Sequence, residues 1–511
     1  MGNKYISVKM PSGYDESHLR KKIEGYIRSK DFTYIIETKS LDARNKNNIH
    51  WQMRLLVTSE AIDISVAVSK VELVIPHKKR SEKVVVVGSG PAGFFAAFVL
   101  QKAGYITTII ERGTDVKKRT VGIEAFESTG VFNPVSNYAF GEGGAGTFSD
   151  GKLTSRSKRI SVEKKFILAS YVNAGAPAEI EYMSHPHLGT DNLKNIVKNL
   201  RKQFEDIGGT VLFETVMNDI KVVAGKVTQI ETNGGSIDAD YFFIAPGHSA
   251  YDTYRMLINR GVGFHTKNFA IGSRMEHHQE IINVAQWGKK TLPGVKAAEY
   301  RLTSKGDGKH QVYSFCMCPG GVIVPATAVE DGNIVNGMSK YLRDNNFANA
   351  ACVATININN MLKREVSAIE TLDWVEKLER SFYDFSKGYS APICGIQDFI
   401  NKKLTRDKFN TSYPMGISQA PLWELLPDEV ENAMRFGLKD FTKKMKGFGT
   451  GNILGLESKT SAPIQVDREK DGRCVGFENL FVIGEGSGYA GGIISSAADG
   501  VKTAMNIALL P

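Results

Sequence analysis

Residues 83–111 read KVVVVGSGPAGFFAAFVLQKAGYITTIIE, and this stretch contains a series of clear local signals. The valine run at 84–87 is typical of a short strand that is buried on both faces. Residues 94–102 are rich in Ala, Leu and Phe and predict a helix, and residues 107–110 predict a second strand. The sequence therefore predicts a β-α-β unit of a parallel α/β fold.

Three glycines occupy the turn between the first strand and the helix. Gly88, Gly90 and Gly93 have the spacing G-x-G-x-x-G, and Glu111 follows the second strand. The first glycine permits the tight turn, the second lets a pyrophosphate approach the backbone, and the third lets helix and strand pack closely. The helix start offers free N–H groups to the anion, and the acid is placed to accept hydrogen bonds from a ribose. We interpret this unit, with Pro91 and Ala92, as a dinucleotide-binding fingerprint; an ordinary βαβ unit with a Gly-rich turn is the alternative.

The composition is that of a globular protein with more than one domain. A chain of 511 residues exceeds what one hydrophobic core supports, so two or three domains are expected. Five cysteines cannot form a disulfide framework, which fits a reducing cytosol, and residues 1–10 lack an apolar signal region. No apolar run approaches the length of a membrane span. We therefore expect a cytoplasmic protein that does not enter a membrane.

The charge balance is mildly basic. The net charge is +9, from 64 basic and 55 acidic residues, and it suits an anionic substrate. The basic residues do not form a dense tract, so nucleic-acid binding is not expected.

The pattern along the chain divides it into four segments. Residues 1–77 predict a small α+β domain with a ferredoxin-like fold. Residues 78–250 predict the first part of the dinucleotide domain, residues 251–445 an inserted α+β substrate or cap domain, and residues 446–511 a return to the dinucleotide domain. The main predicted strands cover residues 4–9, 33–38, 51–57, 62–74, 210–214, 219–223, 226–232, 241–244 and 480–483; the main predicted helices cover 16–29, 191–207, 367–385 and 493–509.

A long glycine-rich loop, SNYAFGEGGAGTFSDGKLTSR, occupies residues 136–156. Residues 146–152 come close to a phosphate-binding P-loop, but position 153 is Leu, so the hydroxyl that holds magnesium is missing. We interpret the segment as a loop whose backbone N–H groups and small residues lie against a flat or anionic ligand. A merely flexible loop is the alternative.

The C-terminal segment again has the character of a nucleotide-binding fold. Residues 480–483 predict a strand, the sequence GEGSGYAGG follows at 484–492, and a final helix begins near Ile493. An NAD site is usually completed within one continuous domain, whereas here the two units lie almost 400 residues apart. This division resembles the FAD-binding flavoproteins of the glutathione reductase superfamily. The resemblance implies that Glu485 lies near the ribityl chain and that Gly491, Gly492 and Ile493 direct a helix N-terminus at the flavin ring.

The chain is similar over nearly its whole length to a family of largely uncharacterised bacterial FAD-dependent dehydrogenases. The motifs that carry this resemblance are GSGPAGFFAA at 88–97, FGEGGAGTFSDGKL at 140–153, HPHLGTDNL at 185–193, APGHSAYDT at 245–253, IGSRMEHHQE at 271–280, VYSFCMCPGG at 312–321 and IGEGSGYAGGI at 483–493. One departure concerns Lys459, where the family more often shows Arg. An Arg there would hold a substrate carboxylate bidentately, and Lys holds it less specifically.

The fold class that follows is α/β: a Rossmann-like FAD-binding domain of the glutathione reductase type, an inserted α+β domain and a small N-terminal α+β domain. The predicted FAD site consists of Gly88, Gly90, Pro91, Ala92, Gly93, Glu111, Arg112, Arg119, Gly144, Gly146, Thr147, Asp150, Gly151, Lys152, Val216, Ala245, Gly247, Gly484, Glu485, Gly491, Gly492 and Ile493. No Cys/His pattern has metal-ligand spacing, so we expect no metal.

Six residues are candidates for chemistry beyond the flavin. Cys316 and Cys318 form a C-x-C pair whose side chains share one face if the strand is extended; the pair either exchanges electrons with the flavin or senses redox state, or it fills a buried strand. Arg274, Glu276 and His277 either hold an anionic substrate and move a proton, or form a surface ion-pair cluster with a packed histidine. His248, which follows Pro246-Gly247, is either a proton donor near the cofactor or a structural cap.

The sequence thus predicts a cytoplasmic FAD-dependent oxidoreductase that transfers hydride between flavin N5 and a small or medium, anionic substrate. NAD(P)H is a candidate transient electron donor, and a homo-oligomer or a protein redox partner stays open. Three other functions are open: a tRNA-modifying flavoprotein, a flavin-bound sensor or scaffold without turnover, and a plain NAD-dependent dehydrogenase.

Overall fold

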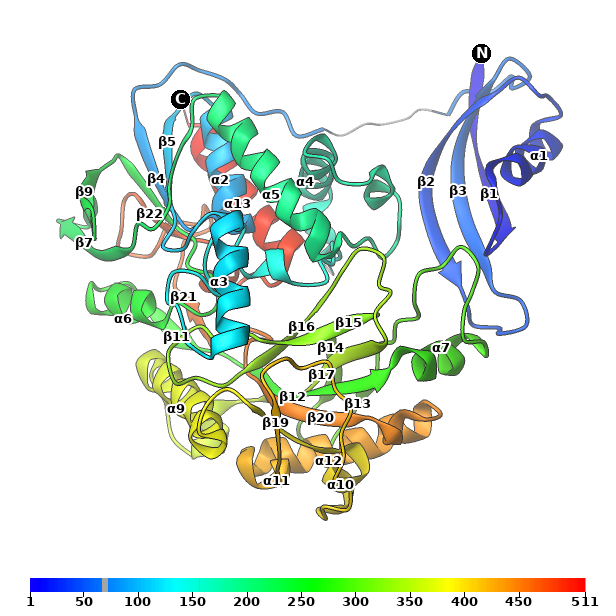
Figure 1. Ribbon diagram of the computed structural model, residues 1–511. Helices are drawn as coiled ribbons and strands as arrows, with labels where there is room; N and C mark the ends of the chain where they lie inside the picture. Colours follow the sequence, from blue (N-terminus) through cyan, green and yellow to red (C-terminus); the bar gives the residue numbers. More distant parts are fainter. Residues whose placement is uncertain (67–71, 156, 511) are drawn as a thin grey trace.

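The computed structural model describes residues 1–66, 72–155 and 157–510, and it shows two large sheets and one small N-terminal sheet (Figure 1). The first large sheet, drawn in the upper part of Figure 1, has the order β22-β10-β4-β5-β6, and every neighbouring pair is parallel. Its strands are β4 Lys83–Val87, β5 Ile106–Ile110, β6 Thr210–Leu212, β10 Tyr241–Ile244 and β22 Leu480–Val482. As predicted, a strand from the C-terminal segment pairs beside one from the first half of the chain.

Successive side chains of β4 pack against opposite faces of this sheet. Val84 and Val86 pack among the helices α2 Pro91–Lys102, α4 Ser161–Asn173, α5 Gly189–Asp206 and α13 Ile493–Ala508, whereas Val85 packs on the other face with Ile220 and Val227. That face is covered by a three-stranded antiparallel sheet of β7 Met217–Val223, β8 Lys226–Thr232 and β9 Gly235–Asp238. A strand that is buried on both faces needs apolar residues at every position, which explains the unbroken valine run.

The second large sheet has the order β13-β14-β17-β12-β20-β18-β19. Its strands are β12 Phe269–His278, β13 Thr303–Ser304, β14 Val312–Cys318, β17 Phe347–Ile356, β18 Ala391–Gly395, β19 Ile417–Gln419 and β20 Asn452–Glu457. β12 lies at its centre, antiparallel to β17 and β20. The sequence predicted that the chain returns to the dinucleotide domain at residue 446. Because β20 still pairs in the second sheet, the chain reaches the first sheet only after this strand. The domain limits themselves stay a prediction.

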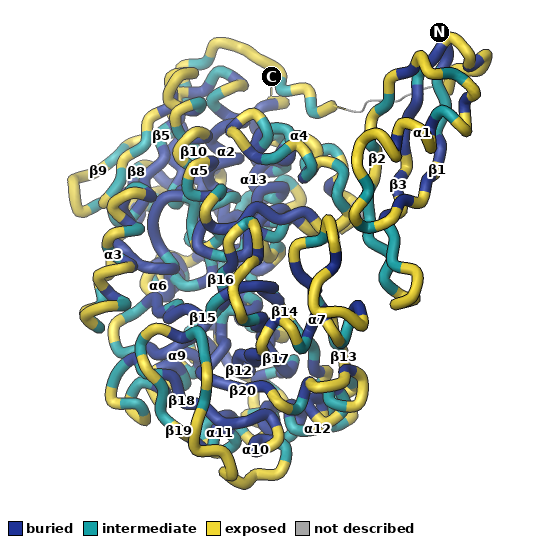
Figure 2. The backbone as a smooth tube through the Cα atoms, turned by 45° about the vertical axis from the view of Figure 1, so that its right-hand side comes forward, coloured by how far each residue is buried: buried dark blue, intermediate teal, exposed yellow. Residues whose placement is uncertain are grey.

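Two shorter strand pairs and several helices complete the body. The pairs are β11 Phe264–Thr266 with β21 Ile464–Val466 and β15 Gly321–Pro325 with β16 Val335–Ser339. The other helices are α3 Val116–Thr129, α6 Tyr251–Asn259, α7 Gln279–Trp287, α8 Ile358–Leu362, α9 Ala368–Ser386, α10 Ile396–Asn401, α11 Leu422–Leu425 and α12 Asp428–Lys444, and the 3₁₀ turns are η1 Ala145–Phe148, η2 Lys158–Ile160, η3 Ala178–Glu181, η4 Phe448–Thr450 and η5 Gly484–Ser487. Figure 2 shows buried backbone running through the interior of both large sheets and exposed backbone at the periphery.

The N-terminal sheet stands to one side of the body (Figure 1). It contains β1 Gly2–Pro11, β2 Thr33–Asp42 and β3 His50–Ser59 in the order β1-β3-β2, with one helix, α1 Glu16–Ile27. Its contact with the body includes main-chain hydrogen bonds from the N–H of Lys39 to Tyr182 and from that of Ser184 to Lys39. The predicted strand at 62–74 appears as a single bridge at Ser65, and residues 67–71 of it lie outside the described residues. The ferredoxin-like fold of this segment therefore stays a prediction.

In the part of the chain that the structure describes, no helix combines the length and apolar character needed to cross a membrane.

Candidate functional site

The glycine turn after β4 is shaped by contact with the neighbouring strand. Gly88 has φ +98°, and a Cβ there would stand 2.4 Å from the carbonyl oxygen of Ala245 at the end of β10. A Cβ on Gly93 would stand 2.0 Å from the carbonyl oxygen of Gly88. Both positions therefore exclude a side chain. A Cβ on Gly90 would meet only the Cα of Gly144, at 3.6 Å, so its backbone stays accessible from outside.

The glycine-rich loop lies across the starts of two helices. A Cβ on Gly144, which has φ +66°, would stand 3.0 Å from the Cα of Gly90, and a Cβ on Gly146 would stand 3.0 Å from Cγ1 of Ile493. Gly90 is the N-cap of α2, and Ile493 is the first residue of α13. The structure thus brings together three of the segments that the sequence singled out; Arg156, the last residue of the predicted loop, lies outside the described residues.

Helices α2 and α13 begin side by side at the carboxyl edge of the parallel sheet. Their N-caps are Gly90 and Gly492, and neither receives a side-chain cap. A Cβ on Gly484, which precedes α13, would stand 2.4 Å from the Cβ of Ala92 in α2. Open space adjoins Gly491 and Gly492, because a Cβ on either would meet nothing within 4 Å. Two helix N-termini with small caps form a suitable environment for an extended anionic ligand.

Arg119 on α3 holds the loop from inside and has no exposed surface. Its guanidinium donates to the main-chain carbonyls of residues 137, 138, 141, 142 and 144, at 2.8–3.3 Å. Burial lowers the pKa of Arg119 to about 10, against the opposing effect of Glu111 and Glu142. The sequence predicted a direct contact with the cofactor, whereas these donors are used to shape the loop that surrounds the site.

Glu111 is also engaged within the protein. Its Oε2 accepts from the N–H and the hydroxyl of Ser89 at 2.9 and 2.7 Å, and its Oε1 accepts from the N–H groups of Gly113 and Gly141 at 2.9 and 3.1 Å. The carboxylate is buried. It therefore links the glycine turn, the end of β5 and the glycine-rich loop, a role that the sequence did not predict.

Several other predicted cofactor residues occupy the border of the same region. Arg112 donates to Asp252 at 2.5 Å and lies 4.5 Å from the ring centroid of Phe140. The N–H of Val216 donates to Asn233 Oδ1 at 2.9 Å, and the hydroxyl of Thr147 donates to the carbonyl of Glu142 at 3.2 Å. Ala245 continues the ladder beside β4, and Gly247, at φ +71°, adjoins open space.

Glu485 on η5 retains partial exposure to solvent. Burial of its carboxyl group raises the pKa of Glu485 to about 7, although the N–H of Gly492 and the ammonium of Lys267 act in the opposite direction. Lys267 itself donates to the carbonyl of Gly488 at 2.5 Å. Glu485, which the resemblance places near the ribityl chain, therefore lies between the start of α13 and Lys267, which stands just before β12 of the second sheet.

Asp150 and Lys152 belong to a buried charge network between the glycine-rich loop and the second sheet. Asp150 accepts from Lys152 Nζ at 2.8 Å and from Arg343 Nε and Nη2 at 3.0 and 2.6 Å. Glu299 lies 3.8 Å from Lys152 and 3.7 Å from Arg343, and His185 contacts it at 2.8 Å. The carboxylates of Asp150 and Glu299 thus balance the charges of Lys152 and Arg343. Lys152 also donates to the carbonyl of Met317 at 2.5 Å, which connects the loop to β14.

The C-x-C pair lies in a bulge of β14. Phe315 pairs with Ala351 and Cys318 with Asn349, so one extra residue is inserted between them. Cys316 has φ +43°, a conformation that such bulges usually assign to Gly and that costs a side chain roughly 1–3 kcal/mol. The strand is not extended here, contrary to the expectation of two side chains on one face. Cys316 is half-buried and Cys318 is buried.

Arg274 on β12 holds this bulge in place through hydrogen bonds. It is fully buried and donates to Glu457 at 2.8 Å, to the carbonyl of Cys316 at 2.7 Å and to the side-chain oxygens of Asn336 and Asn349 at 3.0 and 2.8 Å. Burial raises the pKa of Glu457 to about 7, against the charge of Arg274. The predicted surface ion-pair cluster is wrong for Arg274, because the pair is buried beneath the cysteines.

Comparisons with known proteins agree with this arrangement. The family model described as "FAD-dependent protein, C-terminal domain-like" matches residues 268–460, and the model "Pyridine nucleotide-disulphide oxidoreductase" matches residues 82–251. An uncharacterized protein of Clostridium beijerinckii is 40% identical over 488 residues, which cover 92% of this chain and 91% of that protein. The chain belongs to this family of FAD-dependent proteins. The resemblance stated from the sequence is confirmed, and the protein is a flavoprotein of the oxidoreductase class.

Two solved structures illustrate the more distant similarity. A glycine oxidase from Bacillus cereus is 10% identical, with 83% of this chain and 94% of that chain covered and a TM-score of 0.33. A flavoprotein/dehydrogenase from Cytophaga hutchinsonii is 14% identical, with 83% and 76% covered and a TM-score of 0.33.

In this FAD-dependent protein, Lys459 stands where the family more often shows Arg, and it has an acidic partner. Lys459 Nζ lies 2.8 Å from Glu379 Oε1 and bonds the hydroxyl of Tyr251, and Ser458 donates to the same Glu379 oxygen at 2.6 Å. Burial lowers the pKa of Lys459, against the charge of Glu379. The charge at this position is compensated within the protein.

His248 lies beside this cluster. Its Nε2 contacts the carbonyl of Ser461 at 2.7 Å, and its buried Nδ1 has no partner among the described residues. Burial, followed by the charge of Lys459, lowers the pKa of His248 to about 3. The imidazole is therefore neutral, and its Nδ1 is a buried polar atom without a partner among the described residues.

Arg274 and Glu276 share one face of β12 and His277 lies on the opposite face, yet the three side chains have different partners. Glu276 accepts from Ser412, and His277 Nε2 contacts the carbonyl of Phe448 at 2.7 Å. Both are buried, and successive residues of β12 point to opposite faces. His277 is packed inside the protein, and Glu276 does not belong to a surface ion-pair cluster because it is buried.

Four residues of the region were not found from the sequence: Glu299, Arg343, Glu379 and Glu457 in their roles as charge partners. Arg343, for example, lies 193 positions from Asp150. Charge partners at such separations leave no periodic signal in a single sequence. Among the described residues no group of three or more His, Cys, Asp or Glu could hold a metal ion.

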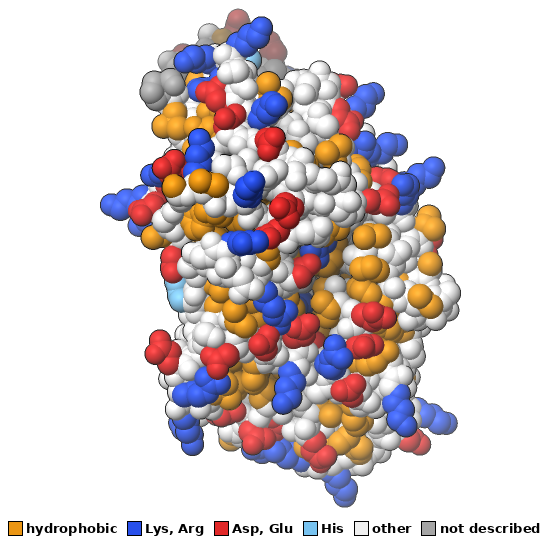
Figure 3. Space-filling view, turned by 90° about the vertical axis from the view of Figure 1, so that its left-hand side faces the viewer, with side chains coloured by type: hydrophobic (Ala, Val, Ile, Leu, Met, Phe, Trp, Pro, Cys, Tyr) orange, Lys and Arg blue, Asp and Glu red, His pale blue; other side chains and the backbone are white. Residues whose placement is uncertain are grey.

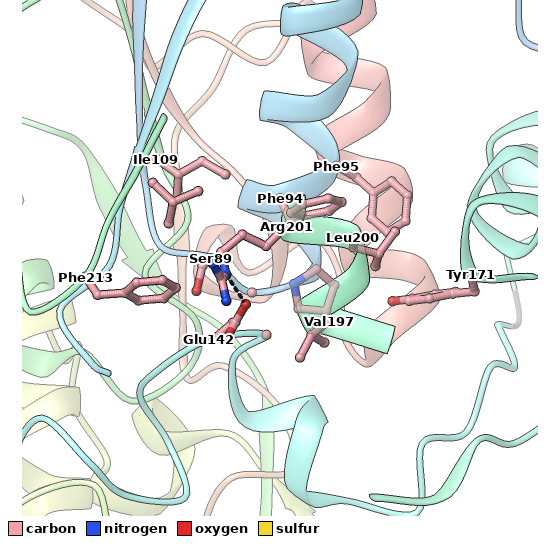
Figure 4. A pocket seen from close by; sticks show the side chains of 14 residues that line it. Ser89, Phe94, Phe95, Ile109, Glu142, Tyr171, Val197, Leu200, Arg201 and Phe213 are labelled. Carbon is pink, nitrogen blue, oxygen red and sulfur yellow. Dashed lines mark hydrogen bonds and ion pairs between the residues drawn. The ribbon is translucent and has the colours of Figure 1, made fainter. Parts of the chain in front are cut away.

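A pocket adjoins the glycine turn, between α2, α5 and the sheet, and Gly90 and Pro91 are among the residues that line it (Figure 4). Its walls are apolar, with Phe94, Ile109 and Leu200 among them, and it encloses about 430 Å³ including the part open to solvent. The ion pair of Arg201 Nε with Glu142 Oε1, at 2.7 Å, lies at its polar side. Because Gly90 and Pro91 belong to the predicted FAD site, the pocket borders that site.

Proposed function

We propose that this protein is an FAD-dependent oxidoreductase that binds FAD across the starts of α2 and α13 and acts on a small or medium, anionic substrate. The observation that carries the proposal is the pairing of these two helix starts. They come from opposite ends of the chain, lie at one edge of one parallel sheet, and are both capped by glycine without a side-chain cap. Such an edge is the usual ligand site of open parallel sheets.

The residues present fit the cofactor. Gly88 and Gly93 let the turn pack against Ala245 and the start of α2, and Gly90 leaves the backbone open where the pyrophosphate would lie. Gly144 and Gly146 would lie along the same side of the ligand, and Gly491 and Gly492 leave open space at the start of α13. Glu111 would support the adenosine half by fixing the turn and the loop, and Glu485 would lie near the ribityl chain.

FAD, when bound, supplies hydride transfer at its N5 atom. The protein would hold the isoalloxazine ring beside the positive end of α13, which favours negative charge on the reduced ring by about 1–2 kcal/mol. Glu485, whose pKa is raised to about 7 by burial, is placed to hold or release a proton at neutral pH. Lys152, with 28% of its side chain exposed, is the cation best placed to attract an anionic substrate.

The tRNA-modifying alternative receives no support from the face of the molecule that Figure 3 shows. On the face drawn in Figure 3, Lys and Arg side chains are interspersed with Asp and Glu among the described residues, instead of forming a basic patch. The electrostatic footprint of nucleic-acid binding requires such a patch.

A substitution that fills the open space tests the cofactor site. Gly491 lacks a positive φ, and a Cβ there meets nothing within 4 Å, so Gly491→Val should fold normally. It should weaken FAD binding at least tenfold, measured by flavin fluorescence titration of the apoprotein. Gly234→Val is the matched control, because Gly234 lies in the exposed turn between β8 and β9 and also lacks a positive φ. Equal affinity in both variants would contradict the placement.

Anaerobic titration of the yellow holoprotein with NADH and NADPH tests the electron donor. Bleaching of the flavin absorbance by either nucleotide identifies it as a reductant. A flavin that neither nucleotide reduces, and that no anionic substrate reoxidises or reduces, would favour the sensor or scaffold instead.

A further inference from the structure

The two sulfurs of the C-x-C pair lie together and differ in access. The bulge in β14 moves Cys316 out of the regular ladder, and the Cys318 thiol also reaches the carbonyl of Cys316 at 3.3 Å. Cys318 has no exposed surface, whereas Cys316 is half-buried. Of the two cysteines, only Cys316 therefore retains exposed surface through which a reaction partner could approach.

Cations surround this pair. Arg274 donates to the carbonyl of Cys316 at 2.7 Å and lies 3.5 Å from the sulfur of Cys318. Lys152 holds the intervening Met317 carbonyl. A hydrogen bond from the Cys318 thiol, followed by the charges of Arg274 and Lys152, lowers the pKa of Cys316 against the effect of burial, whereas the pKa of Cys318 is raised by its partner and by burial. Such an asymmetric pair is typical of a nucleophilic and a resolving thiol.

The other cysteines of the chain provide an internal comparison. Cys352, Cys394 and Cys474 are buried in strands or loops. Burial raises the pKa of each thiol, to about 12 for Cys394 and Cys474. These three fit the role of small apolar residues in the core, and the C-x-C pair does not.

The pair also faces the proposed flavin site. Lys152 comes from the glycine-rich loop, which lies against Gly90 and Ile493, so the loop connects the helix starts to the cysteine bulge. The charge of Cys316 is felt by Glu485 on η5. The bulge, the loop and the start of α13 therefore surround one region.

We propose that Cys316 and Cys318 form a redox-active dithiol–disulfide pair that exchanges two electrons with FAD and, through Cys316, with a small external disulfide. This proposal rests on the proposed function and names its substrate class. At the positive φ of residue 316, Gly would be less strained than Cys. The Cys316 side chain therefore carries a conformational cost.

The exchange balances in electrons and protons. The disulfide accepts two electrons and one proton from reduced FAD; the S–S bond breaks, Cys318 takes the proton, and Cys316 becomes a thiolate. The thiolate then attacks the external disulfide and forms a mixed disulfide, which releases one substrate thiolate. Cys318 loses its proton to solvent and attacks Cys316, which restores the internal disulfide and releases the second thiolate.

Electron counting tests the pair directly. Anaerobic dithionite titration of the oxidised holoprotein should consume two electrons for FAD and two more for the disulfide. Cys316→Ser should consume only the two electrons of FAD. Cys394→Ala is the control and should behave like the parent protein. A parent protein that binds FAD but takes up only two electrons would overturn the proposal while leaving the flavin function intact; a protein that fails to bind FAD would overturn the proposed function itself.

Thiol chemistry provides a second measurement that does not depend on turnover or on FAD. In the reduced apoprotein, dithiobis(nitrobenzoate) should react with Cys316 at neutral pH at least tenfold faster than with Cys352, Cys394 or Cys474, as found by peptide mass mapping. In Cys318→Ala the mixed disulfide on Cys316 should persist, because no resolving thiol remains. Equal reactivity of all five cysteines, or a mixed disulfide equally stable in parent and variant, would count against the pair.

Discussion

Gly500 on α13 lies directly against Ala92 on α2: a Cβ at residue 500 would stand 2.1 Å from the carbonyl oxygen of Ala92. This contact sets how closely the two helices approach, and their N-termini form the centre of the proposed cofactor site. Packing between elements at opposite ends of the chain therefore positions the site.

The first prediction concerns this contact. Gly500→Val should lower the free energy of unfolding by about 1–3 kcal/mol, because a side chain at the contact forces the helices apart. It should also weaken FAD binding, since both helix starts move. Gly25→Ala is the control: Gly25 is exposed in α1 and touches nothing within 4 Å, so Ala should stabilise by about 0.5–1 kcal/mol. Denaturant unfolding of the apoprotein measures the stability of both variants. A Gly500→Val variant with the same free energy of unfolding as the parent protein would contradict the helix contact.

The second prediction concerns Arg119. Arg119→Met leaves five main-chain carbonyls without their donor, and it should lower the free energy of unfolding by about 3 kcal/mol or more. Limited proteolysis should then cut the chain between residues 136 and 153. Arg364→Met is the comparison, because Arg364 and Glu370 are both exposed and their ion pair should contribute no more than about 1 kcal/mol. Similar losses in the two variants would show that Arg119 does not organise the loop.

The third prediction is a pH dependence from Glu457. Burial raises the pKa of Glu457 to about 7, so the folded protein binds a proton that the unfolded chain releases near the ordinary pKa of 4.5. The stability from this group is present below about pH 4.5 and is lost as the pH rises through about 7. In Glu457→Gln this fall should disappear, although the variant is less stable overall because Arg274 loses its partner. Unfolding free energies at several pH values measure the difference, with Glu124→Gln, an exposed substitution on α3, as the control.

The fourth prediction has the opposite sign. Burial lowers the pKa of His277 from 6.5 to about 4, so the unfolded chain binds the extra proton in this range. The stability from His277 is present above about pH 6.5 and is lost as the pH falls through about 4. His277→Gln should flatten this acid limb while its FAD content stays that of the parent, because His277 packs on Phe448. The exposed His18→Gln should leave the limb unchanged; loss of flavin from His277→Gln would contradict the structural role.

Much of the first sheet could be predicted because its signals are local. The apolar runs that form β4 and β5, the glycine spacing at residues 88–93 and the final helix each lie within one short window. The C-terminal strand was recognised for the same reason. The role of Glu111 was less predictable, because its four donors come from three separate turns.

The catalytic candidates show the limit of such prediction. Arg274, Glu276 and His277 are close in sequence, yet β12 directs them to different surroundings. Cys316 and Cys318 were expected on an extended strand, and the bulge was not visible because Cys stands where Gly would signal it.

The amino-acid sequence by itself determined the dinucleotide-binding unit, since backbone that must approach a pyrophosphate closely needs glycines at set spacings after a buried strand. The flavoprotein class followed from the resemblance of its motifs to FAD-dependent proteins. Only the tertiary structure decided which charges are compensated and which sulfur is accessible. Charge compensation and burial depend on residues up to 193 positions apart, such as Asp150 and Arg343, and no local pattern records their distance in space.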